Sequence, residues 1–263
     1  PRARREYRAV QWNIHPDCEQ ISFEEAICAE PGVQGAVALA ILAMRDSGIL
    51  PPTESGVRPF VRKAVPGDRA DLFRVCLKTG DAGSDGTHLF TDPALLGSIY
   101  VGPYLDCSPR LAYALDDGSG KAVGYTLGVL NSSEFRLLCS EKYWPSVSDQ
   151  HRSSNHPYNT LEEQLIRDEI VTWTSPGDSS ASDSAHFTEY PSHLHIDLLP
   201  DYQGKGCGKV MIMTLLSQLR NLGSTGVHLI QAKDNHRAFQ FYTKMGFVVI
   251  KEMKSELMLG KKL

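Results

Sequence analysis

The sequence contains no apolar run long enough to cross a membrane as a helix. Its longest strongly apolar stretch, residues 36–44, has nine residues, whereas a bilayer requires about 20. The sequence also lacks an excess of positive charge, because 27 Lys and Arg residues stand against 31 Asp and Glu residues, for a net charge of −4. Nucleic-acid-binding surfaces are usually rich in Lys and Arg. We therefore expect neither a membrane nor a nucleic acid among the partners of this protein.

Closely spaced cysteines are absent as well. The six cysteines among the 263 residues are scattered, with no Cys-x-x-Cys pair, so their spacing indicates neither a zinc site nor a disulfide framework. Scattered cysteines in a chain of this length are typical of reduced, mostly buried thiols. The first five residues include three arginines, but no apolar segment of the kind found in signal peptides follows them. We expect an intracellular protein, cytoplasmic or nuclear, that holds no metal.

Composition divides the chain into a short helical segment and a larger α/β domain. Residues 1–56 contain a helix rich in Ala, Leu and Ile and then a linker rich in Pro, so they are predicted to form an N-terminal helical extension. In residues 57–263, strand patterns alternate with helix patterns, which predicts a mixed sheet flanked by helices. Residues 131–191 are an insertion in this domain, with two predicted helices.

The sharpest local pattern is a glycine-rich loop between a predicted strand, residues 194–199, and a predicted helix, residues 206–222. Glycines let the backbone N–H groups point into one cavity, and the helix N-terminus adds a partial positive charge. Such a loop can hold a phosphate or pyrophosphate. The loop lacks the Gly and Ser or Thr of a P-loop and the third glycine of a dinucleotide fingerprint, so we expect neither nucleotide hydrolysis nor NAD binding. Its residues are Gln203, Gly204, Lys205, Gly206, Cys207, Gly208 and Lys209.

Two motifs together resemble the GNAT superfamily of N-acetyltransferases. Residues 203–208 fit its Gln/Arg-x-x-Gly-x-Gly/Ala signature, and residues 235–247 fit its pattern Asn-x-x-Ala-x-x-x-Tyr-x-x-x-Gly-Phe. The resemblance covers about residues 57–257 and implies a mixed central sheet that splays apart between its fourth and fifth strands. A narrower resemblance is to bacterial and fungal acetyltransferases similar to the acetyltransferase-like C-terminal domain of O-GlcNAc hydrolases. It is carried by residues 64–68, 76–83 and 102–105.

The resemblance implies acetyl-CoA as a cosubstrate. Backbone N–H groups near Leu198 and Leu199 would hold the acetyl carbonyl and pantetheine, and the loop would take the pyrophosphate. Tyr242 would protonate the departing thiolate, with packing of a helix against the sheet as the less favoured alternative. Asn235 would cap that helix and could also bond the cofactor. The implied cofactor-binding set is Leu198, Leu199, Gln203, Gly204, Lys205, Gly206, Cys207, Gly208, Lys209, Asn235 and Tyr242, with inward packing as the alternative for Cys207.

A general base is harder to identify. Residues 193–198 alternate polar and apolar side chains, so one face of this strand carries His193, His195 and Asp197. His195 or Asp197 could relay a proton from the amine, or the three side chains could form a hydrogen-bonded set at the edge of the core. Many relatives place an acidic base farther up the strand, where Glu189 is the nearest carboxylate. A bulge in the strand would exchange its two faces.

These patterns predict an acetyl-CoA-dependent N-acetyltransferase that moves an acetyl group directly to a primary amine of a small molecule or protein. The insertion, residues 131–191, would shape the groove for this acceptor. One alternative is a catalytically silent domain that only binds acetyl-CoA. Another is a metallohydrolase, because His193-x-His195-x-Asp197 resembles the metal motif of the metallo-β-lactamase fold, although Leu198 stands where that motif has another His.

Overall fold

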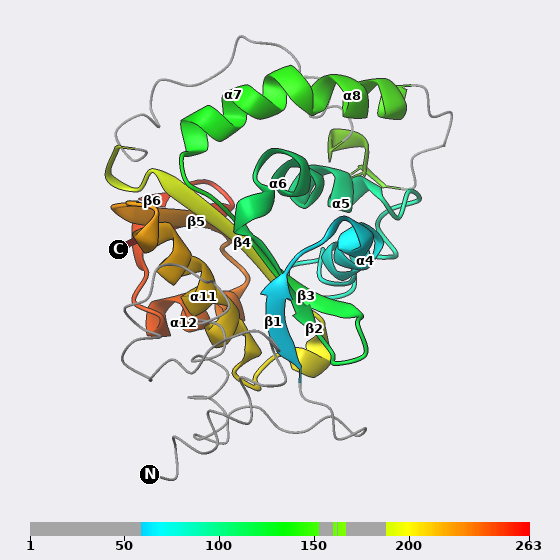
Figure 1. Ribbon diagram of the computed structural model, residues 1–263. Coiled ribbons are helices and arrows are strands. Elements are labelled where there is room, and N and C mark those ends of the chain that lie inside the picture. The colour runs from blue at the N-terminus through cyan, green and yellow to red at the C-terminus, as the bar shows by residue number, and fades with distance from the viewer. Residues whose placement is uncertain (1–58, 153–159, 162, 167–187) are drawn as a thin grey trace, which may run out of the picture.

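A seven-stranded mixed sheet forms the centre of the part of the chain that the computed structural model describes. The described residues are 59–152, 160, 161, 163–166 and 188–263 (Figure 1). Their strand order is β1-β2-β3-β4-β5-β7-β6. The predicted mixed sheet is therefore confirmed, whereas the helical extension expected at residues 1–56 lies outside the described residues.

The first half of the sheet is antiparallel. β1 (Phe60–Lys63) pairs with β2 (Ala112–Asp116), β2 pairs with β3 (Ala122–Val129), and β3 pairs with β4 (Ser192–Leu198). β2 and β3 form a hairpin. The β3–β4 register runs without a shift, so no bulge exchanges the two faces of β4, and its polar and apolar side chains alternate as the sequence indicates.

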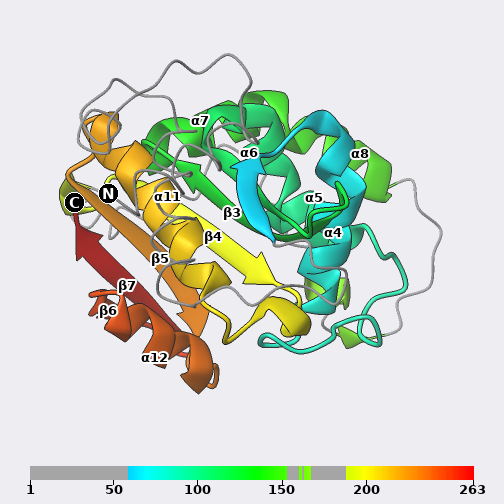
Figure 2. The same cartoon turned by 60° about the horizontal axis from the view of Figure 1, so that its bottom comes forward.

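The sheet opens between β4 and its parallel neighbour β5 (Gly226–Ala232). The two strands pair only at Ser192 with Val227 and at His193 with His228, and they separate toward their C-terminal ends (Figure 2). The predicted splay between the fourth and fifth strands is confirmed. Beyond His193 and His228, the backbone N–H and C=O groups on the facing edges of β4 and β5 do not pair with each other.

The C-terminal end of the chain adds a strand that the sequence analysis missed. β7 (Glu256–Lys262) lies between β5 and β6 (Val248–Glu252), antiparallel to both. Its sequence includes Gly260, and glycine is disfavoured in strands unless another group approaches closely. A Cβ atom at Gly260 would lie 2.8 Å from the ring of Tyr190, so close packing explains this glycine in the strand.

Helices cover both faces of the sheet and bury a separate apolar cluster on each face (Figure 1). Within the insertion, the described residues include α7 and α8. On one face lie α4 (Arg69–Lys78), α5 (Leu95–Tyr100), α6 (Gly102–Cys107), α7 (Ser132–Lys142) and α8 (Trp144–Arg152); on the other lie α11 (Cys207–Asn221) and α12 (His236–Lys244). The connections contain short 3-10 helices at η1 (Pro66–Asp68), η2 (Pro109–Leu111) and η4 (Pro200–Tyr202).

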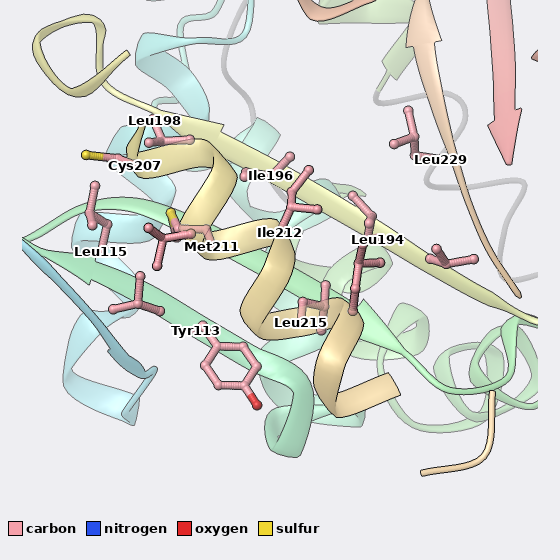
Figure 3. Close-up of a cluster of buried hydrophobic side chains, with 14 of the residues drawn as sticks. Tyr113, Leu115, Leu194, Ile196, Leu198, Cys207, Met211, Ile212, Leu215 and Leu229 are labelled. Carbon is pink, nitrogen blue, oxygen red and sulfur yellow. The ribbon is translucent and has the colours of Figure 1, made fainter. Parts of the chain in front are cut away.

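Helix α11 fixes the orientation of β4. Met211, Ile212 and Leu215 of α11 are fully buried and pack with the apolar side chains of β4 at Leu194 and Ile196 (Figure 3). Burying side chains of this size stabilises the fold by about 1.5–3 kcal/mol each. Since β4 must present its apolar side chains to α11, its polar side chains are held on the opposite face.

Two further findings concern the helices and the cysteines of the described residues. Among them, none of the helices combines the length and apolar character needed to span a bilayer. Their four cysteines are free thiols, three of them buried: Cys76, Cys107, Cys139 and Cys207, of which Cys107 is partly exposed. Cys18 and Cys28 lie outside the described residues.

A glycine in β3 permits the close approach of α11, and its replacement should destabilise the fold. A Cβ atom at Gly128 would lie 2.7 Å from Cδ1 of the fully buried Leu215. We expect Gly128→Ala to lower the free energy of unfolding by about 1–3 kcal/mol, because overpacking strains a dense core. Chemical denaturation measures this change. Gly67→Ala is the matched control, since no atom lies within 4 Å of its added Cβ; equal losses for both variants would contradict the prediction.

Candidate functional site

The backbone of β4 presents hydrogen-bonding groups to the opening in the sheet. The Leu199 N–H donates to Val123 O at 3.0 Å, while Leu198 is the register partner of Gly124. In an antiparallel ladder this pattern turns the N–H and C=O of Leu198 away from β3 and toward β5. The Leu198 carbonyl accepts a hydrogen bond from Nε2 of Gln203 at 2.7 Å. Of the two predicted backbone donors, Leu198 is therefore the one that faces the opening.

The predicted glycine loop connects the end of β4 to the N-terminus of α11. Gly204 and Gly206 adopt positive φ angles of 70° and 85°, a region that favours glycine. Gly206 is the N-cap residue of α11, and no side chain caps the helix. The first N–H groups of α11 are consequently available to an anion, and the helix dipole makes this end of the helix positive.

Cationic side chains surround this loop. Lys205 and Lys209, both in the predicted cofactor-binding set, are exposed. Arg237 of α12 also reaches the loop, because its Nη2 atom lies 3.6 Å from the position that a Cβ atom would take at Gly204. Sequence reasoning missed Arg237, since an arginine in the first turn of a helix is unremarkable until the fold brings the helix beside the loop.

Cys207 belongs to the core rather than to the loop surface. It is 1% exposed and packs in the apolar cluster beneath α11 (Figure 3). Burial raises the pKa of its thiol, despite the nearby positive charge of Lys205. The packing alternative for this residue is therefore confirmed.

Helix α12 places Asn235 and Tyr242 on the same side of the sheet as the loop. Asn235 caps the helix as predicted, because its Oδ1 atom accepts the N–H of Ala238 at 3.0 Å. Tyr242 is 8% exposed and lies between the rings of Phe241 and Phe247, so its predicted packing role is also observed. Burial, and secondly the negative charge of Asp197, raise the pKa of Tyr242.

Asp197 is the centre of a hydrogen-bonded group on the polar face of β4. Its Oδ2 atom accepts the hydroxyl of buried Tyr125 at 2.5 Å and lies 3.2 Å from Nε2 of His195. Nδ1 of His195 lies 3.0 Å from the carbonyl oxygen of Tyr100. Both His195 nitrogens thus face acceptors, an arrangement that favours the protonated ring. Burial lowers the pKa of His195, but the charge and hydrogen bond of Asp197 outweigh it and raise the pKa above 6.5.

His193 behaves differently, although it lies on the same face. Burial lowers its pKa to about 3, assisted by the positive charges of His228 and Arg136, so the ring is neutral at ordinary pH. Its Nδ1 atom and the Ser132 hydroxyl oxygen are 2.8 Å apart, and that hydroxyl also lies 2.8 Å from the carbonyl oxygen of Pro191. A carbonyl only accepts, so the hydroxyl donates to Pro191 and His193 donates from Nδ1.

The metallohydrolase alternative would require a set of metal ligands around His193, His195 and Asp197. Among the described residues, no group of three or more His, Cys, Asp and Glu side chains is arranged to hold a metal ion. His195 and Asp197 are bonded to each other, while His193 is bonded to Ser132. Glu189, the other carboxylate considered as a base, forms an ion pair with Lys262 at 2.7 Å.

A mixed sheet that opens beside a glycine loop and a helix N-terminus is the arrangement of an acetyltransferase of the GNAT type, and comparisons with known proteins agree. The model of the Acetyltransferase (GNAT) family matches residues 181–247. The crystal structure of SsHAT shares 33% sequence identity with this chain and a TM-score of 0.67, over 78% of this chain and 98% of SsHAT. The chain belongs to the GNAT family of acetyltransferases.

Two curated relatives support the narrower resemblance. Protein O-GlcNAcase of Rattus norvegicus and of Mus musculus are each 25% identical to this chain over 207 residues, which are 77% of the chain. The matched region is 22% of each relative, so the chain spans about a fifth of the length of the curated relatives that it matches.

The ion pair of His195 with Asp197 leads to a titration prediction. In Asp197→Asn the burial of His195 is no longer opposed by a carboxylate, so its pKa should fall below 6.5. NMR titration of the His195 ring measures this shift. A histidine whose folded pKa exceeds its unfolded pKa adds stability below the unfolded pKa, and this stability disappears as pH rises through the folded pKa. The stability lost in Asp197→Asn should therefore be larger at pH 5.5 than above the folded pKa.

Tyr125→Phe is the matched control for this titration. It removes one hydrogen bond to Asp197 but leaves the carboxylate beside His195. The pKa of His195 should then stay above 6.5. An unchanged His195 pKa in Asp197→Asn would show that the carboxylate does not hold the charge of this ring.

Proposed function

We propose that the protein is an acetyl-CoA-dependent N-acetyltransferase that moves an acetyl group directly to a primary amine of a small molecule or protein. The observation that carries the proposal is the position of the proton-carrying side chains. Asp197, with Tyr125 and His195 bonded to it, lies on the strand that borders the opening, and its charge acts on Tyr242 of α12. These groups accompany an anion-binding loop at the same end of β4.

The residues around the opening fit the chemical parts of acetyl-CoA. The loop at Gly204 and Gly206 and the uncapped N-terminus of α11 suit a pyrophosphate. Lys205, Lys209 and Arg237 would add positive charge near the phosphates. The N–H of Leu198 would donate to the thioester carbonyl, where a fixed donor stabilises the developing negative charge.

Tyr242 would supply the proton for the departing thiolate. Its raised pKa keeps the phenol protonated at neutral pH, which is the form that an acid requires. An ordinary thiol has a pKa near 8.5, below that of the phenol, so the proton transfer from Tyr242 to the sulfur is uphill and is completed only when the tyrosinate regains a proton. The C–S bond breaks as the amine nitrogen bonds to the acetyl carbon, and the tyrosinate then recovers a proton from solvent.

Asp197 would receive the amine and its proton. An alkylamine with a pKa near 10.4 arrives as an ammonium ion, and the carboxylate of Asp197 attracts it. His195 would act as a positioning residue, because its two ring nitrogens are engaged by Asp197 and the Tyr100 carbonyl. The hydroxyl of Tyr125 would hold the same carboxylate in place.

Calorimetric titration with acetyl-CoA tests the cofactor part of this proposal. We expect binding of acetyl-CoA and CoA in the micromolar range, since both carry the pyrophosphate and pantetheine that the site fits. NADH also carries a pyrophosphate but lacks pantetheine, so it should not bind. Failure of acetyl-CoA and CoA to bind would contradict the proposal and its catalytically silent alternative together.

Replacement of Tyr242 tests the chemical step. Tyr242→Phe keeps the ring that packs between Phe241 and Phe247 and removes the proton donor. We expect kcat to fall about 100-fold or more, within the range for a lost general acid, while the Kd for acetyl-CoA stays unchanged. Steady-state kinetics with a panel of primary amines measures the change.

Phe241→Leu serves as a control for packing on α12, and we expect it to retain most of kcat. Equal kcat values for wild type and Tyr242→Phe would exclude Tyr242 as the acid. Acetyl-CoA binding without turnover on any amine would favour the catalytically silent alternative.

A further inference from the structure

Gln231 of β5 is a buried side chain whose carboxamide has no partner. It is 8% exposed, and neither Nε2 nor Oε1 has a hydrogen-bond partner among the described residues. Both atoms of the amide are buried, so bulk water does not satisfy them. More than nine in ten buried polar groups in native proteins have a partner, and an unpaired one is destabilising. The carboxamide of Gln231 therefore needs a hydrogen-bonding partner that the described residues do not provide.

Gln231 lies where β5 has already separated from β4. The last β5 residue that pairs with β4 is His228, and Gln231 is three residues closer to the open end. Side chains alternate along a strand, so Gln231 shares its face with Leu229, which belongs to the cluster beneath α11 and α12. This is the face on which Leu198 and Tyr242 are buried.

The backbone of β5 confirms which groups border the opening. Lys233 N–H donates to Ser255 O, while Ala232 is the register partner of Glu256. This pattern turns the N–H and C=O groups of Ala232 and Ile230 away from β7 and toward β4. Gln231 thus lies between two residues of β5 whose backbones face the opening.

We propose that the carboxamide of Gln231 binds an amide of the pantetheine arm of acetyl-CoA. The pantetheine arm carries secondary amides, each with one donor and one acceptor, and the carboxamide of Gln231 offers both complements. With the pyrophosphate at the glycine loop and the acetyl group beside Leu198, the arm between them passes through the opening that Gln231 borders. This inference rests on the proposed binding of acetyl-CoA and adds a binding residue from β5.

Gln231→Met tests the inference by removing the amide while keeping the length of an unbranched side chain. We expect the Kd for CoA to rise about tenfold, because a pantetheine amide loses its buried partner. The Kd for 3′-phosphoadenosine 5′-diphosphate, which contains the phosphates but no pantetheine, should not change. Calorimetry with both compounds measures the two values. Gln240→Met, at an exposed position on α12, is the matched control and should change neither.

The stability of the unliganded variant separates binding from folding. Replacing an unpaired buried amide by an apolar group should leave Tm unchanged or raise it. Wild-type binding of CoA together with an unchanged CoA Kd in Gln231→Met would overturn the inference, and a lowered Tm would then assign the amide to a buried water. An equal rise in the Kd values of Gln231→Met for CoA and for 3′-phosphoadenosine 5′-diphosphate would also overturn the inference. Failure of the wild type to bind either compound would overturn the proposed function itself.

Discussion

The separation of β4 from β5 is the constraint on which the rest of this structure depends. Backbone N–H and C=O groups require partners, and two neighbouring strands normally provide them for each other. Here the pairing stops after His193 and His228, although both strands continue for several residues. On β4 the Leu198 carbonyl is satisfied by Gln203, whereas the Leu198 N–H faces the opening. A ligand with its own amides and carbonyls can complete such an interrupted sheet.

The alternation of β4 converts this opening into a site with two chemically distinct sides. Apolar side chains of β4 are fixed against α11, whose N-terminus and preceding glycines suit an anion. The polar side chains of the same strand are consequently fixed on the face covered by α4 to α8. A molecule held in the opening would contact groups suited to an anion on one side of the sheet and titratable groups on the other.

Much of this arrangement could be predicted from particular residues. Asn235 has the character of a helix cap, and the glycines before α11 mark a tight turn; both patterns are local, so the sequence alone contains them. β7 was missed because Gly260 and the lysines near its end weaken the strand pattern. Arg237 and Gln231 were missed for a different reason. Their significance depends on what the fold places around them, since an arginine or glutamine is ordinary until its neighbours are known.

The pKa values of the two histidines of β4 also depend on neighbours that the sequence alone does not reveal. The sequence presents His193 and His195 as equivalent neighbours on one face, yet their pKa values shift in opposite directions. Both rings lose solvation, which by itself disfavours the charged form. Only His195 has Asp197 beside it, so its ring gains a counter-charge, while His193 faces a serine hydroxyl and a second histidine.

In the proposed reaction, the carboxylate of Asp197 has a cationic partner of its own before an ammonium ion arrives. The protonated His195 would supply that cation, and the hydroxyl of Tyr125 would fix the orientation of the carboxylate. Burial, and secondly this negative charge, raise the pKa of Tyr242 and keep its phenol protonated. In the proposed mechanism, Asp197 would therefore accept the proton of the amine and would also help Tyr242 to keep the proton that the thiolate needs.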